Sequence, residues 1–140
     1  MVLIKSIPPV EEIRERLTPL FHDEELRLVL LFGSVATGGV HRGSDIDLAF
    51  LYDKPVDLLG LTNNVIRLLK TDNVDVVDLR RADPLLKFSA ARQGKVLYEK
   101  TPGIFHEFYS LAFRMYGDTK KLRDAKARSI RIFLEERGLR

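Results

Sequence analysis

Two short apolar segments, joined by a loop that holds four glycines, constrain the fold of this chain more than any other feature. Residues 26–32 are mostly apolar and end at Gly33, and residues 45–52 begin Asp-Ile-Asp and continue with apolar side chains. Their length and flanking glycines favour buried strands. Because only a loop, with one helical turn after Ser34, is expected between them, the two strands argue against a purely doubly wound parallel sheet.

Helical and strand patterns surround this pair. Apolar residues at helical spacing predict helices, and β-branched runs predict strands. The predicted elements are helices over 9–17, 56–70 and 84–94, strands over 74–79 and 95–99, and two further helices after 101–103 with apolar stripes at 104–115 and 122–134. We therefore expect an α+β (mixed α/β) fold, with a small mixed β-sheet flanked by helices. Residues 1–100 would form its core and residues 101–140 a C-terminal helical extension of the same domain.

Composition narrows the function classes. The 140 residues are 45% hydrophobic and 31% charged, which suits one globular domain. There is no cysteine, so thiol-ligated metal sites and disulfides are excluded. No membrane span or signal peptide is recognised, and we expect a cytoplasmic protein without a membrane partner.

The positive charge is concentrated at the C-terminal end. Residues 113–140 hold nine basic and four acidic side chains, whereas the remaining 112 residues hold 14 and 16. This pattern indicates either a solvated helix face or contact with an acidic partner or nucleic acid, of which nucleic acid is the less favoured. The aromatic residues Phe105, Tyr109, Phe113 and Tyr116 recur at helical spacing and indicate either core or a partner surface.

The loop between the two strands carries the chemistry. Gly33 and Ser34 follow the first strand, where a serine cap, free backbone N–H groups and a glycine would admit a phosphate. Asp45 and Asp47 are two residues apart on a strand and share one face. Two adjacent carboxylates repel each other unless a cation lies between them, and Mg²⁺ prefers oxygen ligands. Arg42 is either a contact of the phosphates or a solvated loop residue.

A third carboxylate would complete a two-metal site. Asp72, Asp75 and Asp78 are the candidates. Asp75 and Asp78 lie on opposite faces of the predicted third strand, so only one can face the metals. We favour Asp75, at the start of the strand, and expect Asp78 to contact solvent or cap a helix and Asp72 to lie in a turn.

Together these residues resemble the signature of the DNA polymerase beta-like nucleotidyltransferase superfamily, which is Gly-Ser, ten residues, and then Asp-x-Asp. Here the ten residues are 35–44. The sequence around these residues is similar to that of the minimal nucleotidyltransferase branch of this superfamily. Residues 84–88, 94–99 and 116–120 look like the corresponding segments of the members that act as antitoxins paired with small helical HEPN-domain toxins.

The resemblance implies a nucleotidyltransferase fold and a Mg²⁺-dependent enzyme that binds ATP. It implies transfer of AMP to a tyrosine hydroxyl of a HEPN toxin. Gly33, Ser34 and Arg42 would bind the nucleotide. Asp45, Asp47 and Asp75 would be the catalytic residues and would ligate two Mg²⁺ ions, whose charge stabilises the attacking and leaving oxygens.

Two other functions are compatible with the same residues. The chain could mask a toxin by binding alone, or it could modify a small molecule or RNA. The nucleotide, the acceptor and the oligomeric state, including a homo-oligomer, are left open by the sequence.

Overall fold

The fold is built on a four-stranded mixed sheet with the strand order β3-β2-β1-β4. The computed structural model describes residues 8–33 and 45–138. The strands are β1 (Leu26–Phe32), β2 (Ile46–Tyr52), β3 (Val74–Asp78) and β4 (Lys95–Glu99). β1 is antiparallel to β2 and β4, whereas β2 and β3 are parallel. The predicted α+β class is thus confirmed, with the strand pair 26–32 and 46–52 at the centre of the sheet.

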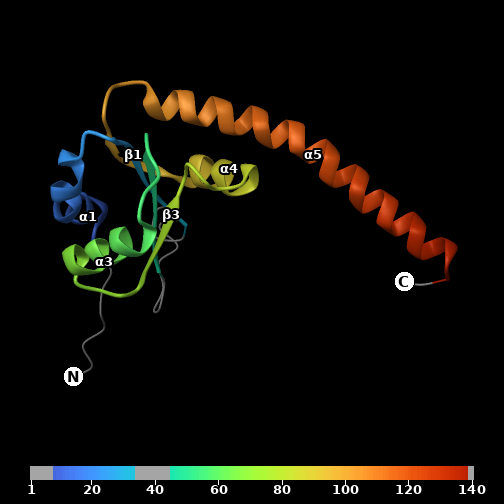
Figure 1. The fold of residues 1–140 in the computed structure, drawn as a ribbon, viewed down its shortest axis with the longest axis horizontal. Helices are drawn as coiled ribbons and strands as arrows, with labels where there is room; N and C mark the ends of the chain where they lie inside the picture. Colours follow the sequence, from blue (N-terminus) through green and yellow to red (C-terminus); the bar gives the residue numbers. More distant parts are fainter. Residues whose placement is uncertain (1–7, 34–44, 139–140) are drawn as a thin grey trace.

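Helices cover both faces of the sheet (Figure 1). α1 (Val10–Leu17) and α3 (Leu58–Leu69) pack on one face, where Phe50 is among the fully buried side chains. α4 (Pro84–Gln93) and the start of α5 (Ile104–Glu136) pack on the other. Because both faces are covered, every residue of β1 except Arg27 is buried, and this explains why its sequence is almost continuously apolar.

Short polar contacts fix the ends of the helices. The side chains of Asp57 and Asp83 accept hydrogen bonds from the backbone N–H groups of Gly60 and Leu86, at 3.2 and 2.8 Å, and so cap α3 and α4. The Glu99 carboxylate accepts a 2.7 Å bond from the Phe105 N–H at the start of α5. These caps explain why the predicted helix starts lie close to the observed ones.

The C-terminal region differs from the prediction of two helices, because it forms the single 33-residue helix α5. Gly117 lies near its middle, and a Cβ at this position would meet nothing within 4 Å. Its cost within a helix is only ~1 kcal/mol. The turns around it are tied together, since the Thr119 hydroxyl bonds to the Met115 carbonyl at 3.1 Å and Lys120 pairs with Asp124 at 2.8 Å. The helix therefore continues through the glycine.

Two smaller features complete the fold. A 3-10 helix, η1 (Thr18–His22), follows α1 and was not predicted. Among the aromatic residues at helical spacing, Tyr109, Phe113 and Tyr116 all contact the Phe88 ring of α4, although Phe113 stays 60% exposed. The aromatic face is therefore largely the contact between α4 and α5. No helix in the described part of the chain has both the length and the apolar character needed to cross a membrane.

Candidate active site

Strand directions bring the candidate residues to one end of the sheet. β1 ends at Phe32 and Gly33, and β2 runs back from that end because the two strands are antiparallel. β3 begins at the same end because it is parallel to β2. The register places Asp47 beside Phe32 on one side and beside Asp75 on the other. Neighbouring strands lie about 4.8 Å apart, so Asp47 and Asp75 are direct neighbours.

Asp75 and Asp78 occupy different environments, as the strand period requires. Asp75 is exposed and stands next to Asp47. Asp78 lies at the other end of β3, is only 9% exposed, and accepts a 3.0 Å hydrogen bond from the Arg80 N–H. The expectation that Asp78 contacts solvent or caps a helix was wrong, because the chain turns there and uses its carboxylate to hold the turn. The structure therefore brings together Asp45, Asp47 and Asp75, and leaves Asp78 apart.

The surroundings of Asp47 disfavour the ionised form of its carboxyl group. Its side chain is half-buried, and burial raises the pKa of its carboxyl above the ordinary value of 3.8. The negative charges of Asp75 and then Asp45 raise this pKa further. Like charges that cannot move apart disfavour ionisation. The three carboxylates therefore create a negative site at the end of the sheet.

Gly33 has a role that the spacing of the motif did not reveal. Its φ is +77°, in the left-handed region that glycine adopts freely. A Cβ at this position would lie 2.1 Å from the Asp47 Oδ2, far inside van der Waals contact. Gly33 therefore makes room for the Asp47 carboxylate. No sequence signal could have shown this, because the contact depends on the register between β1 and β2.

The donor set suits a hard divalent cation. Asp45, Asp47 and Asp75 offer carboxylate oxygens, and a cation among them would offset the repulsion that raises the pKa of Asp47. Within residues 8–33 and 45–138, no three histidine, cysteine, aspartate or glutamate side chains converge closely enough to form a complete metal centre. The predicted nucleotide contacts Ser34 and Arg42, and the predicted helical turn after Ser34, lie outside the described residues.

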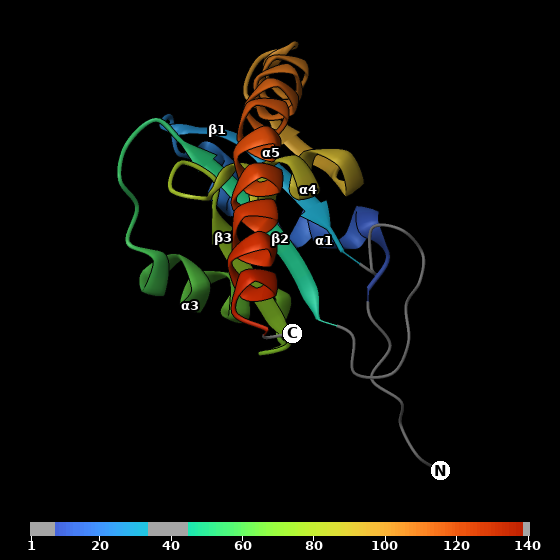
Figure 2. The ribbon, with the colours of Figure 1, turned by 90° about the vertical axis from the view of Figure 1, so that its right-hand side faces the viewer.

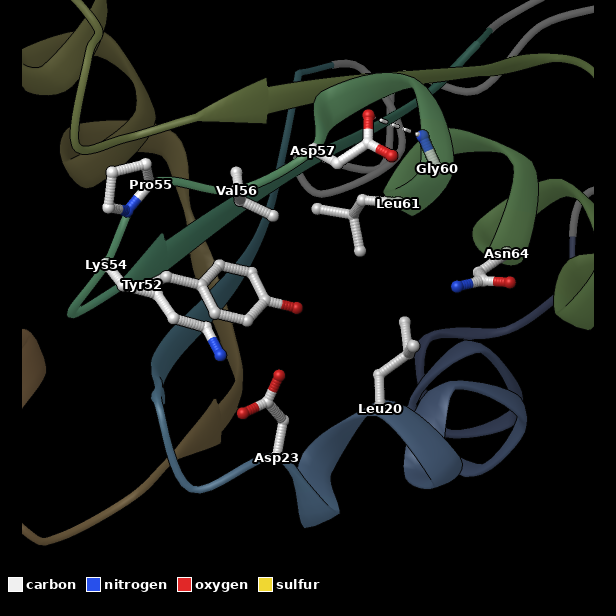
Figure 3. A pocket seen from close by; sticks show the side chains of 10 residues that line it. All are labelled: Leu20, Asp23, Tyr52, Lys54, Pro55, Val56, Asp57, Gly60, Leu61 and Asn64. Carbon is white, nitrogen blue, oxygen red and sulfur yellow. Dashed lines mark hydrogen bonds between the residues drawn. The ribbon is translucent and has the colours of Figure 1, made fainter.

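A hollow lies at the opposite end of the sheet. It has a volume of about 320 Å³ and is bounded by η1, the end of β2 and the start of α3. Figure 3 shows the Tyr52 hydroxyl and the Asp23 carboxylate pointing into it. Burial, with a smaller contribution from the negative charge of Asp23, raises the pKa of Tyr52 to about 12. The carboxylates at the start of β2 do not line this hollow.

Comparison with known proteins agrees with this geometry. The sequence profile of the family described as "Polymerase beta, Nucleotidyltransferase" matches residues 15–102. The chain is 32% identical over 147 residues to the protein adenylyltransferase MntA of Aphanizomenon flos-aquae, and the match covers 96% of this chain and 98% of the relative.

Solved structures give the same result. A toxin-antitoxin crystal structure with AMP-PNP matches with a TM-score of 0.74 and 31% identity, over 88% of this chain and 98% of the other. A complex of the tri-AMPylated Shewanella oneidensis HEPN toxin with its MNT antitoxin matches with a TM-score of 0.71 and 28% identity, over 86% and 98% of the two chains.

The fold and the matched profile define a nucleotidyltransferase. This chain belongs to the polymerase beta nucleotidyltransferase family, and it is similar over nearly its whole length to the protein adenylyltransferase MntA. The resemblance drawn from Gly33-Ser34 and Asp45-x-Asp47 is thereby confirmed at the level of the family and of its MntA branch.

Proposed function

We propose that this chain is a protein adenylyltransferase that acts as an antitoxin, transferring AMP from ATP to a tyrosine hydroxyl of a small helical HEPN toxin. One observation carries the proposal: Asp47 lies beside Asp75 and near Asp45, next to the glycine that follows β1. Full-length similarity to MntA, and structural similarity to complexes that contain AMP-PNP or an AMPylated HEPN toxin, support the choice of nucleotide and acceptor.

Each candidate residue has a role in this reaction. Gly33, Ser34 and Arg42 are assigned to the triphosphate, where backbone N–H groups and one positive charge oppose its negative charge. Asp45, Asp47 and Asp75 are assigned to hold Mg²⁺, two ions in all. When bound, Mg²⁺ neutralises charge on the attacking and leaving oxygens.

The transfer is a single displacement at the α-phosphorus of ATP. The tyrosine oxygen forms a bond to the α-phosphorus of ATP while the bond to the pyrophosphate oxygen breaks. The proton of the hydroxyl passes to Asp75, which is the exposed carboxylate beside Asp47, and then to solvent. Most of the acceleration comes from positioning and charge stabilisation, as in other phosphoryl transfers. Because the reaction consumes ATP and modifies a HEPN toxin, we place it in the cytoplasm.

The test uses the purified 140-residue chain, labelled ATP, Mg²⁺ and a HEPN toxin. We expect the wild-type chain to label the toxin, and the Asp45→Asn/Asp47→Asn double variant to lose labelling while it stays folded by circular dichroism. Asp53→Asn is the matched control, because Asp53 lies just beyond the other end of β2 and pairs with Arg27. It should label normally.

Each other outcome contradicts a specific part of the proposal. Labelling by the double variant at the wild-type rate would show that these carboxylates do not hold the metal. Neutralisation of the toxin without any label would mean that the chain acts by binding alone. Label found on RNA or on a small molecule, and not on the toxin, would identify a different acceptor.

A further inference from the structure

The C-terminal half of α5 leaves the body of the protein. Every residue from Lys120 to Phe133 is exposed, and the contacts of α5 with α4 and the sheet come from its first half. Figure 1 shows this part of the helix extending far beyond α4. We call residues 120–136 the α5 arm. Its exposed apolar side chains indicate that another molecule covers it.

The arm presents an apolar stripe that continues the buried face of α5. Leu122, Ile130 and Phe133 are 71, 50 and 50% exposed. At about 100° per residue, Leu122 and Phe133 lie in line with Ile104 and Met115, which face the body, and Ile130 lies beside them. The same stripe therefore packs on the sheet and α4 in the first half of the helix and is exposed in the second, where the Arg137 guanidinium lies 3.7 Å from the centroid of the Phe133 ring.

Charge argues against a second copy of this chain as the occupant. The arm carries six basic and three acidic side chains, and all six basic side chains but only one acidic side chain lie within residues 120–131. Two such arms paired with each other would bring these positive charges within a Debye length, which is about 8–10 Å at ordinary salt. An acidic surface, in contrast, would gain from the same charges.

The apolar stripe argues for a protein rather than a nucleic acid. Contacts to phosphates come from basic and polar groups and need no apolar stripe, whereas exposed leucine, isoleucine and phenylalanine side chains on one helix face are typical of helix-in-groove recognition. We propose that the α5 arm is the docking element for the toxin partner, and that it binds an acidic helical surface with an apolar seam. This inference rests on the proposed function, because that function supplies the partner.

The direction of the arm explains how docking would serve the reaction. The arm slopes from the start of α5 toward the level of the sheet end where β2 and β3 begin, in both views (Figures 1 and 2). Asp47 and Asp75 lie at that end, on the face covered by α4 and α5. A partner held along the inner side of the arm would therefore stand on the same side of the sheet as the carboxylates.

The size of the arm limits how much of the interface with the partner it can form. Seventeen helical residues span about 25 Å and a helix is about 10–12 Å wide, so one face covers only part of the ~800 Å² per partner of a standard interface. The partner must also contact the body. The arm thus contributes affinity, and its loss should raise the KM for the toxin while leaving kcat near the wild-type value.

The experiment compares two variants of the full-length chain. Leu122→Ser/Ile130→Ser/Phe133→Ser removes the stripe. Glu135→Gln is the matched control, since this side chain lies on the opposite face of the helix and outside the basic segment 120–131. Calorimetry with the HEPN toxin and steady-state labelling give the affinity, KM and kcat. We expect the stripe variant to bind about tenfold or more weakly and the control to match wild type.

Several results would overturn the docking role. Equal toxin affinity for all three proteins would do so, and so would an arm-dependent homodimer seen by light scattering of the chain alone. Arm-dependent binding to phosphatidylserine vesicles or to labelled RNA, with unchanged toxin affinity, would identify a different ligand. If the wild-type chain binds the toxin but does not label it, the proposed function fails while calorimetry still tests the arm.

Discussion

Replacing Gly33 with alanine tests whether the end of β1 must leave room for the Asp47 carboxylate. The substitution adds one methyl group at a φ of +77°, which side chains other than glycine's rarely accept. That methyl group would lie 2.1 Å from the Asp47 Oδ2. Either the backbone at Gly33 or the carboxylate of Asp47 has to move.

Both costs can be estimated. The left-handed backbone costs about 1–2 kcal/mol for an L-residue, and the displaced carboxylate adds to it, so the free energy of unfolding should fall by about 1–3 kcal/mol. For a chain of this size, that is a decrease in Tm of about 3–10 °C. A shift of a catalytic group by ~1 Å costs about 100-fold in rate, so adenylyl transfer should fall far more than stability.

Two other glycines provide controls. Gly103 also has a positive φ, +99°, but its Cβ would meet nothing within 4 Å. The Gly103→Ala variant should therefore be less stable than the wild-type chain and should transfer AMP at the wild-type rate. Gly117 lies inside α5 with open space around it, so Gly117→Ala should gain about 0.5–1 kcal/mol with transfer unchanged. Calorimetric Tm, urea unfolding and labelling of the toxin measure all three.

A double-mutant cycle decides whether the clash is the cause. In an Asp47→Ala background there is no carboxylate to displace. Gly33→Ala should therefore lower the free energy of unfolding only by the cost of the left-handed backbone conformation. The reasoning is refuted if Gly33→Ala costs the same stability in both backgrounds, or if the single variant transfers AMP at the wild-type rate.

Three further predictions follow from single residues. The pKa of Asp47 is raised in the fold, so the unfolding free energy of the wild-type chain without Mg²⁺ should fall as the pH rises from about 3.8 toward this higher pKa. Asp47→Asn should remove this fall and give a higher Tm at neutral pH, with no gain from added Mg²⁺. The pKa of Tyr52 is about 12 in the fold and about 10 when unfolded, so stability should decline between these values by up to about 2–3 kcal/mol. Urea unfolding at pH 9 and pH 11.5 should show a smaller decline for Tyr52→Phe. Asp83→Ala removes the cap of α4 and should cost about 1 kcal/mol in urea unfolding without changing the KM for ATP; an unchanged midpoint would contradict the cap.

Much of this protein was determined by local sequence. The strand over 26–32, the helix that begins after Asp83 and the strand over 95–99 were predicted because apolar periodicity and capping residues act within a few positions of the chain. The pairing of Asp45 with Asp47 on one face follows from the two-residue period of a strand, and the choice of Asp75 over Asp78 follows from the position of Asp75 at the start of the strand. Their roles in metal binding and catalysis stay predictions.

Tertiary structure decided the rest, because the contacts involved join distant parts of the chain. The register of β1 against β2 places Gly33 against Asp47, and no spacing along the sequence encodes that contact. Burial and the approach of Asp75 raise the pKa of Asp47. The single long helix was not predicted from its two apolar stripes, and the structure shows that the helix continues through Gly117 between them. The local sequence pattern determined which residues form most of the helices and strands. The packing of these elements against one another determined which residues form the site and which part of α5 is exposed.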